Sequence, residues 1–441
     1  MTKVGFISLG CSKNLVDTEV MLRKLHDAGF EITPDETEAE IIIINTCGFI
    51  ESAKQESIDN ILDAAKLREW GKCRHIIATG CLVERYREEV MKELPEIDAM
   101  VGVGSIADIV DACCAVMRGE KYSSFKDKNT SELGGERILT TADHTAYLKI
   151  AEGCDNKCTY CAIPLIRGKF RSRKIEDVVA EARDLEALGV KELNLIAQDT
   201  SRYGLDIYGE YSLAKLVREI CKATDIPWIR LLYCYPDKIT DELIAELRDN
   251  PRLLKYMDIP IQHISDKILT RMNRHGGKAL ICDVVKKLRE SVPGIVLRTT
   301  AMVGFPGESE EDFTELCEFI KEAKFDRFGA FTYSEEEGTA AAELDGKVDA
   351  QVAQDRYDVL MQTQLTVTEE QNAEKIGNTY TVLCDGFDTV AEIYYGRSYA
   401  DAPDVDGRVY FTSKEKVSPG EFVKVKINEA LDYDLVGTKI N

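Results

Sequence analysis

The chain has 441 residues, 14 cysteines and a formal net charge of −22 at pH 7. This length allows two or three domains with sizeable cores. No apolar run of about 18 residues occurs, so the sequence predicts no signal peptide or membrane span and favours a cytoplasmic protein. Many cysteines in such a chain favour metal ligation over disulfides. The strong acidity argues against tight binding of free nucleic acid.

The first 120 residues alternate short apolar runs with amphipathic stretches. The predicted strands are residues 4–9, 41–44, 75–79 and 100–103, and the predicted helices are residues 17–28, 51–69, 84–94 and 106–118. Strands and helices that alternate at this length predict a parallel sheet with helices on both faces. We therefore expect a doubly wound α/β domain over residues 1–120.

One cysteine follows each of the first three predicted strands. These are Cys11, Cys47 and Cys81, which are 36 and 34 residues apart. The three thiols are expected to meet, because the carboxyl ends of parallel strands lie along one edge of a sheet, where ligands bind. Three thiolates at one point can hold a four-iron cluster and leave one iron open. Eight cysteines belong neither to this group nor to the second group described below, and we expect them to be buried or half-buried packing residues.

A polar linker over residues 121–145 leads to the second group of cysteines. Cys154, Cys158 and Cys161 stand in the order C-x3-C-x2-C. Thiolates suit iron–sulfur centres, and three of them can bind three irons of a four-iron cluster. With this spacing the open iron usually binds S-adenosylmethionine, and Tyr160 is then expected beside its adenine. Zinc, which usually takes four ligands in paired C-x2-C units, and buried free thiols are the alternatives.

Residues 146–372 are predicted to form an open relative of the eight-stranded β/α barrel. The strand-like segments are residues 146–151, 192–197, 228–233, 256–261, 295–302 and 327–333, with helical stretches such as 175–188 and 241–249 between them. Six strand–helix units predict a partial (β/α)6 barrel whose site lies at the carboxyl ends of the strands. The first strand leads to the cysteine loop, and Gln198 follows the second strand.

Residues 373–441 change to short β-rich runs separated by Gly, Asp and Pro. The runs at residues 380–384, 390–395, 408–412, 422–429 and 435–439 predict a small barrel of the oligonucleotide-binding type. An RNA-binding surface needs positive charge, but residues 374–441 hold twelve acidic and eight basic side chains. This balance favours a basic protein as the partner.

Several segments resemble the methylthiotransferases of the radical S-adenosylmethionine superfamily. They are LGCSKNLVDTE (9–19), INTCGFI (44–50), GCDNKCTYCAIPLIRG (153–168), MDIPIQH (257–263), RMNR (271–274) and GRSYADAPDVDG (396–407). The resemblance covers essentially the whole chain, and none of the six cysteines departs from the family pattern. It implies two [4Fe-4S] clusters, S-adenosylmethionine and replacement of a C–H bond by C–S–CH3. It also implies that the C-terminal barrel is a TRAM domain.

The same resemblance suggests further site residues and partners. It places Tyr160 and the backbone near Val303 and Gly304 at the adenine of S-adenosylmethionine, and Gln198 at its ribose or methionine. The segments flanking the cysteines are most similar to members that modify the β-carbon of an aspartate in ribosomal protein S12 of the small subunit. A flavodoxin-type protein is the expected electron donor. No catalytic residue beyond the cluster ligands is indicated.

Two other functions stay open at this point. A methylthiotransferase that acts on an adenosine of transfer RNA would use the same clusters, and salt-sensitive binding of transfer RNA would favour it. A non-catalytic iron–sulfur carrier or scaffold would not cleave S-adenosylmethionine. Carriers hold each cluster with four protein thiolates, and neither group of three has a fourth cysteine in register.

Overall fold

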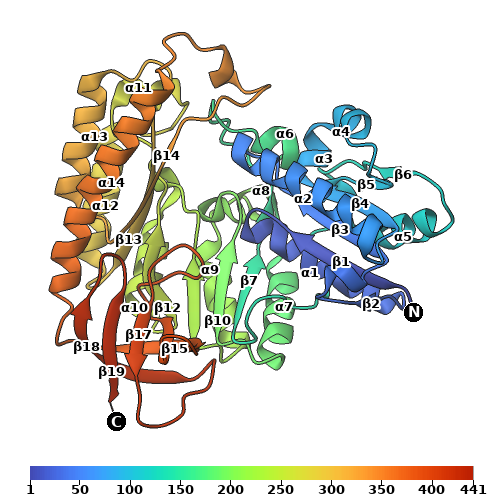
Figure 1. Cartoon of the computed structure of the whole chain (residues 1–441). Helices are drawn as coiled ribbons and strands as arrows, with labels where there is room; N and C mark the ends of the chain where they lie inside the picture. Colours follow the sequence, from blue (N-terminus) through green and yellow to red (C-terminus); the bar gives the residue numbers. More distant parts are fainter. Residues whose placement is uncertain (441) are drawn as a thin grey trace.

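The computed structural model describes residues 1–440, which form an N-terminal parallel sheet, a central open β/α barrel and a C-terminal closed β-barrel (Figure 1). This arrangement confirms the α/β fold class, the partial (β/α)6 barrel and the small C-terminal β-barrel predicted from the sequence. In Figure 1 the N-terminal sheet lies beside the β7 edge of the central barrel, and the C-terminal barrel lies below it.

The N-terminal sheet has the strand order β2-β1-β3-β4-β5-β6, and all its pairs are parallel. Its strands are β1 (Lys3–Ser8), β2 (Glu31–Ile32), β3 (Ile41–Thr46), β4 (His75–Gly80), β5 (Ala99–Val101) and β6 (Tyr122–Ser124). The helices are α1 (Ser12–Asp27), α2 (Glu51–Trp70), α3 (Cys81–Arg85), α4 (Arg87–Glu93) and α5 (Ile109–Met117). The chain leaves β1 for one neighbour, β2, and returns to the other, β3, so the sheet is doubly wound around this switch point.

The four isoleucines of β3 show why helices cover both faces of this sheet. Ile41 and Ile43 pack with α1 and α5, whereas Ile42 and Ile44 pack with α2, α3 and α4. Side chains alternate between the two faces of a strand, so a strand that is apolar at every position must be buried on both sides. All four isoleucines have no exposed surface.

The central sheet has the order β14-β13-β12-β11-β10-β7 and is also parallel throughout. Its strands are β7 (Thr145–Lys149), β10 (Glu192–Ile196), β11 (Trp228–Leu231), β12 (Leu253–Asp258), β13 (Val296–Val303) and β14 (Arg327–Thr332). The helices in this part are α6 (Ile163–Arg167), α7 (Ile175–Ala187), α8 (Leu205–Tyr208), α9 (Leu213–Ala223), α10 (Asp241–Asp249), α11 (Asp266–Arg271), α12 (Gly277–Ser291) and α13 (Glu310–Ala323). A short antiparallel pair, β8 (Ala151–Glu152) and β9 (Arg171–Ser172), frames the cysteine loop.

Helix α14 (Ala350–Ala373) leads from the central barrel to the C-terminal barrel. That barrel closes in the order β15-β16-β17-β19-β18, with strands β15 (Thr379–Asp388), β16 (Ile393–Arg397), β17 (Val409–Thr412), β18 (Phe422–Ala430) and β19 (Leu435–Ile440). Glu192 of β10 pairs with Arg230 at 3.0 Å and with Arg397 of the C-terminal barrel. All three side chains are buried, so a shared ion cluster fixes the small barrel to the central one.

Some elements differ from the sequence-based expectation. The predicted helix over residues 17–28 begins earlier, at Ser12, immediately after Cys11. The helix predicted over residues 84–94 is two short helices, α3 and α4, which meet at Tyr86. Strand β6 adds residues 122–124 to the N-terminal sheet, within the stretch expected to be a linker. Its sequence does not alternate apolar and polar residues, so no strand was expected there. The segment becomes a strand because it pairs with the edge of β5.

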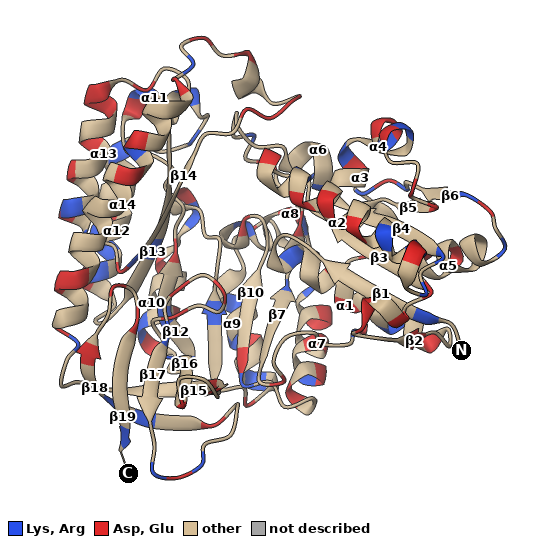
Figure 2. Ribbon diagram, in the orientation of Figure 1, with Lys and Arg blue, Asp and Glu red and all other residues tan. Residues whose placement is uncertain are grey.

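The acidic charge of the chain is spread over outer helices of the molecule, as Figure 2 shows for α7 and α13. Helix α13 alone carries five glutamates and one aspartate within Glu310–Ala323. In residues 1–440, no helix is long and apolar enough to cross a membrane.

Candidate radical S-adenosylmethionine site

The first trio of cysteines lies at the carboxyl ends of three adjacent parallel strands. Cys11 follows β1 and caps α1, Cys47 follows β3, and Cys81 follows β4 as the first residue of α3. Cys11 is exposed, Cys47 is half-buried and Cys81 is buried. Burial raises the pKa of the Cys81 thiol to about 11, opposed by Arg167 and reinforced by Cys11 and Cys47. The structure thus brings together the three thiols that the strand ends predict.

Gly10 keeps the Cys11 loop against the Cys47 loop. Its φ is +86°, and a Cβ at this position would lie 2.9 Å from the Cys47 Cβ and 3.0 Å from its Sγ. Only glycine allows both this left-handed conformation and this close approach without strain.

The second trio lies in the loop between β8 and α6. Cys154 and Cys158 are buried and Cys161 is half-buried. The Tyr235 hydroxyl lies 3.4 Å from the Cys158 Sγ, and the Asn156 amide donates to the Cys154 Sγ at 3.4 Å. Burial raises the pKa of Cys154 to about 11. The pKa of Cys161 is raised by burial and by the neighbouring Cys158.

Each trio provides three thiolates, and soft sulfur ligands of this kind bind iron–sulfur clusters. No group of three His, Cys, Asp or Glu side chains in the described part of the chain is placed to hold a single metal ion. A four-iron cluster does not need the three sulfur atoms to surround one ion, because each thiolate binds a different iron atom.

The residues predicted at S-adenosylmethionine occupy different surroundings. Tyr160 packs edge-on against Phe305, with ring centroids 6.4 Å apart. Gln198 donates to Glu152 Oε1 at 2.5 Å, while its own Oε1 is enclosed and has no hydrogen-bond partner among residues 1–440. An enclosed acceptor without a donor suits a polar ligand. The structure therefore leaves Gln198 available for the predicted role.

Val303 is the last residue of β13, and Gly304 follows it. The Val303 side chain is fully buried in the barrel core, and its carbonyl accepts from the Tyr333 N–H at 2.8 Å. The Gly304 N–H donates to Glu308 Oε2 at 3.0 Å. These two backbone groups are already bonded within the protein, and contact of this turn with adenine stays a prediction.

Three residues other than glycine have left-handed backbone in the second cysteine loop and after two strands of the barrel. Lys157, Tyr233 and Gln262 have positive φ angles of 52°, 62° and 70°. Residues other than glycine seldom adopt this region, and such strain is often found at functional sites. Tyr233 and Gln262 follow β11 and β12, so the strained turns lie at the strand ends of the barrel.

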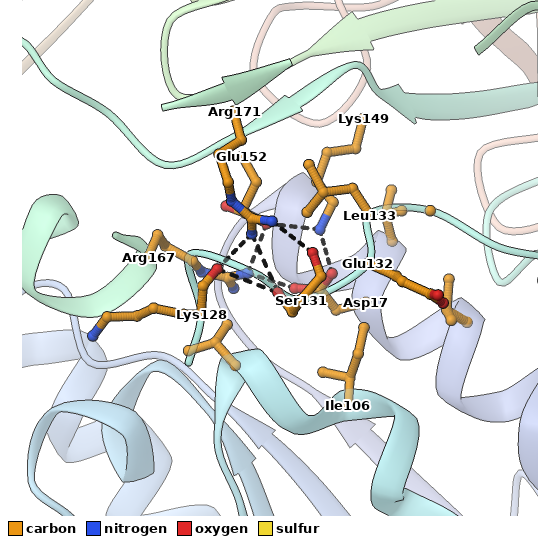
Figure 3. A pocket seen from close by; sticks show the side chains of 14 residues that line it. Asp17, Ile106, Lys128, Ser131, Glu132, Leu133, Lys149, Glu152, Arg167 and Arg171 are labelled. Carbon is orange, nitrogen blue, oxygen red and sulfur yellow. Dashed lines mark hydrogen bonds and ion pairs between the residues drawn. The ribbon is translucent and has the colours of Figure 1, made fainter. Parts of the chain in front are cut away.

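A buried ionic network connects Cys81 of the first trio to Gln198, the residue predicted at S-adenosylmethionine. Figure 3 shows the central ion pairs of this network. Arg167 Nη2 donates to the Cys81 Sγ at 3.4 Å, and Arg167 Nη1 pairs with Asp17 Oδ2 of α1 at 2.5 Å and with Glu152 Oε2 at 3.2 Å. Lys149 of β7 pairs with the same two carboxylates. Glu152 also accepts from Gln198, so hydrogen bonds run from the first trio to the predicted cofactor residue.

The charges of this network balance, two cations against two carboxylates. Burial alone would raise the pKa of Glu152, but Lys149 and Arg167 outweigh it and hold this pKa well below its usual range. Figure 3 shows the cations of Lys149 and Arg167 directed toward Asp17 and Glu152 at the interface of the two sheets. Removing one member would leave a buried charge unpaired, which typically costs about 3–5 kcal/mol.

A cleft of about 620 Å³ opens beside both trios. Phe49 and Ile50, which follow Cys47, line one side, and Tyr160, which precedes Cys161, lines the other. The β14 edge of the open barrel completes it with Phe331 and Tyr333. The cleft is the size of an ordinary ligand site.

Sequence reasoning missed two residues of this site, Tyr235 and Arg167. Tyr235 follows β11, so its position after a barrel strand could have predicted that it lies at the site. Arg167 lies six residues after Cys161, and its partners Asp17 and Glu152 come from elements that meet only in the folded chain. No sequence spacing indicates that contact.

Three family descriptions match the chain. They are Uncharacterized protein family UPF0004 at residues 3–102, the Radical SAM superfamily at residues 148–320 and the TRAM domain at residues 376–440. The barrel, its cysteine loop and the second match define a radical S-adenosylmethionine enzyme, a class that uses S-adenosylmethionine and a [4Fe-4S] cluster.

Close relatives show which family within this class the chain belongs to. The ribosomal protein uS12 methylthiotransferase RimO of Clostridium botulinum (strain Eklund 17B / Type B) is 50% identical over 439 residues, 99% of this chain and 97% of the relative. The protein of the same name from Desulforamulus reducens is 49% identical over 440 residues, 99% of each chain. The chain belongs to the RimO family of methylthiotransferases, which confirms the family expected from its motifs.

Among solved structures, the chain resembles the radical S-adenosylmethionine methyltransferase TsrM from Kitasatospora setae, with cobalamin and a [4Fe-4S] cluster bound. The TM-score is 0.56 at 16% identity, and the match covers 77% of each chain. At this identity the likeness shows a shared fold alone.

Proposed function

We propose that this protein attaches a methylthio group to the β-carbon of an aspartate in ribosomal protein S12. The observation that carries the proposal is the pair of cysteine trios, with one buried ionic network running from Cys81 of the first trio to Gln198, in a chain that is 50% identical to a RimO protein over 99% of its length. A chain with a single radical-enzyme trio would lack a second sulfur-bearing centre.

The proposal assigns one [4Fe-4S] cluster to each trio. Cys154, Cys158 and Cys161 would hold the cluster that binds S-adenosylmethionine, with Gln198 and Tyr160 beside that cofactor. Cys11, Cys47 and Cys81 would hold the second cluster. When bound, these groups supply radical hydrogen abstraction and the methylthio transfer.

The protein's own side chains hold and orient the reacting groups. Asn156 fixes the Cys154 loop, because its amide donates to Asp199 Oδ2 at 2.7 Å and its carbonyl accepts from Lys238 at 2.9 Å. Tyr235 stands against Cys158. Arg167 and Lys149 hold the two sheets at a fixed spacing and, being buried, keep water out of the contact between them.

A basic ribosomal protein suits the acidic surface of this chain, with its net charge of −22. We assign the reaction to the cytoplasm, where the ribosomal substrate is found, and a flavodoxin-type protein as the electron donor. Tight binding of free nucleic acid is not part of the proposal.

The test uses anaerobically reconstituted protein, S-adenosylmethionine and a chemical reductant. Separate reactions receive small ribosomal subunits or bulk transfer RNA, and mass spectrometry measures added methylthio groups. A modified aspartate in S12 is the expected result. A modified adenosine would keep the chemistry and change the substrate, and no cleavage of S-adenosylmethionine would support the non-catalytic iron–sulfur alternative.

A further inference from the structure

Lys13 lies between the two cysteine trios. It is two residues after Cys11, in the first turn of α1, and its Nζ is 3.2 Å from the centroid of the Tyr233 ring. Tyr233 follows β11 and is two residues before Tyr235, whose hydroxyl contacts the Cys158 Sγ at 3.4 Å. A carbon that reacts with groups held by both trios is expected between the trios, because each trio supplies one part of the reaction.

Among residues 1–440, no carboxylate pairs with the ammonium group of Lys13. The residue is only 7% exposed, yet within residues 1–440 no carboxylate lies within 4 Å of its Nζ and no hydrogen-bond acceptor is bonded to it. The buried Lys149 and Lys238 differ, since each pairs with two carboxylates. The side chain of Lys13 is largely buried, but its Nζ is not among the enclosed side-chain atoms without a partner and still reaches solvent, so an anionic ligand can approach it beside the Tyr233 ring. An unpaired cation at this position is therefore available to an anionic group of a ligand.

The first turn of α1 provides further donors at the same place. The cap residue Cys11 makes no side-chain hydrogen bond to this turn, and the turn holds no acidic residue. The backbone N–H groups of Ser12, Lys13 and Asn14 have no acceptor in the part of the chain described here. The enclosed Ser12 Oγ likewise has no partner there. Free N–H groups at the start of a 16-residue helix favour an anion, and Lys13 adds a full positive charge.

We propose that Lys13 and the first turn of α1 bind the side-chain carboxylate of the substrate aspartate and thereby select it. This inference rests on the proposed function. The carboxyl carbon of aspartate is bonded directly to the β-carbon, so a fixed carboxylate also fixes the carbon that reacts. Asparagine presents no charge to Lys13, glutamate places its carboxylate one carbon farther away, and an adenine base has no carboxylate.

Two other anions could meet the same lysine: the carboxylate of S-adenosylmethionine and an anionic cluster on Cys11. Each predicts a different defect. If Lys13 served the cofactor, its loss would weaken binding of S-adenosylmethionine. If Lys13 served the cluster, its loss would lower the iron and sulfide content or shift the cluster's reduction potential. Neither defect would depend on whether the protein substrate carries aspartate or asparagine.

The experiment compares Lys13→Met with the wild type and with two further variants. Lys13→Arg keeps the positive charge. Lys215→Met is a matched control, because Lys215 also stands over a tyrosine ring, that of Tyr208 at 5.7 Å, but away from both trios. Binding is measured anaerobically on cluster-loaded protein by fluorescence anisotropy. The probes are recombinant S12 with aspartate at the modified position and the same protein with asparagine there.

The wild type and Lys215→Met are expected to bind the aspartate form about tenfold to a hundredfold more tightly than the asparagine form, the range of a charge-assisted hydrogen bond. Lys13→Met is expected to bind both forms equally, with unchanged iron content and unchanged affinity for S-adenosylmethionine. Lys13→Arg is expected to keep a preference for aspartate.

Three outcomes would overturn the inference. They are a preserved aspartate preference in Lys13→Met, an equal loss of affinity for both probes, and a loss of iron or of S-adenosylmethionine binding. If the wild type modifies the S12 aspartate while any of these occurs, only the role of Lys13 fails. If the wild type neither binds nor modifies S12, the proposed function fails and the inference falls with it.

Discussion

The two cysteine trios are built in opposite ways. Cys154, Cys158 and Cys161 lie within one loop, so local chain geometry brings them together. Cys11, Cys47 and Cys81 come from three strand ends, 36 and 34 residues apart, and meet only when the N-terminal sheet is folded. A site made by one loop depends on that loop, whereas a site made by three strands depends on the whole sheet. The two sites should therefore fail under different substitutions.

Cysteine substitutions should separate the two sites most strongly. We expect Cys158→Ala to abolish cleavage of S-adenosylmethionine, because the class needs that cluster for reduction of the cofactor. Cys81→Ala should still cleave S-adenosylmethionine but form no methylthio product. Each variant should lose about four irons per chain relative to wild type, as measured by iron analysis after reconstitution. Normal methylthio product from Cys81→Ala would contradict the role of the first trio.

Arg167→Gln should have the next largest effect, because it breaks the ionic network between α1 of the N-terminal sheet and the central barrel. It leaves Asp17 and Glu152 with one cation in place of two, and we expect a loss of about 3–5 kcal/mol in the free energy of unfolding. Urea unfolding of the apoprotein measures it. Arg68→Gln is the control, since Arg68 pairs with Asp98 near the surface, where loss of one pair changes stability by about 1 kcal/mol or less. Equal effects of the two substitutions would show that the network does not join the sheets.

Gly10→Ala should damage the first trio and spare the second. A residue with a Cβ is less stable in left-handed backbone by roughly 1–2 kcal/mol. The new methyl group would also lie too close to Cys47. Gly29→Ala is a matched control, because Gly29 has the same φ of +86° and no described atom within 4 Å of its added Cβ. We expect both variants to lose stability and only Gly10→Ala to lose iron. Cleavage of S-adenosylmethionine should persist in both.

Asp312→Asn should have the smallest effect, because Asp312 belongs to neither trio. It caps α13 with Ser309 and accepts from Ser265 and Lys267 at 2.6 Å. Burial alone would raise its pKa, but the hydrogen bonds from Lys267, Ser265 and Ser309 outweigh burial and lower the pKa. We expect a loss of about 1–2 kcal/mol at pH 7.

The pH dependence follows from that lowered pKa. Stability from a carboxylate with a lowered folded-state pKa is complete above its unfolded-state pKa, about 3.9, and is lost as the pH falls toward the folded-state value. Urea unfolding at pH 7 and at pH 3 should therefore show a smaller difference between wild type and Asp312→Asn at pH 3. A constant difference at both pH values would contradict the carboxylate contribution.

The sequence predicts the fold class and the meeting of the first trio because both depend on regular patterns. The isoleucines of β3 indicate a strand buried on both faces, and parallel strands place their carboxyl ends together. The network of Arg167, Asp17 and Glu152 was not predicted, because it depends on how two sheets dock. The early start of α1 was also missed, since Cys11 is an uncommon helix cap and gives no side-chain hydrogen bond.

Helix α1 also limits how this enzyme can be re-engineered. The same helix carries Lys13 beside Cys11, Asp17 against Arg167, and Met21 and Leu25 in the core of its own sheet. An inserted or deleted residue near its start would rotate the remaining side chains by about 100° and misplace all of these contacts together. A chimaera that takes its N-terminal sheet from another relative should therefore inherit α1 and the Lys149 and Arg167 positions from one parent.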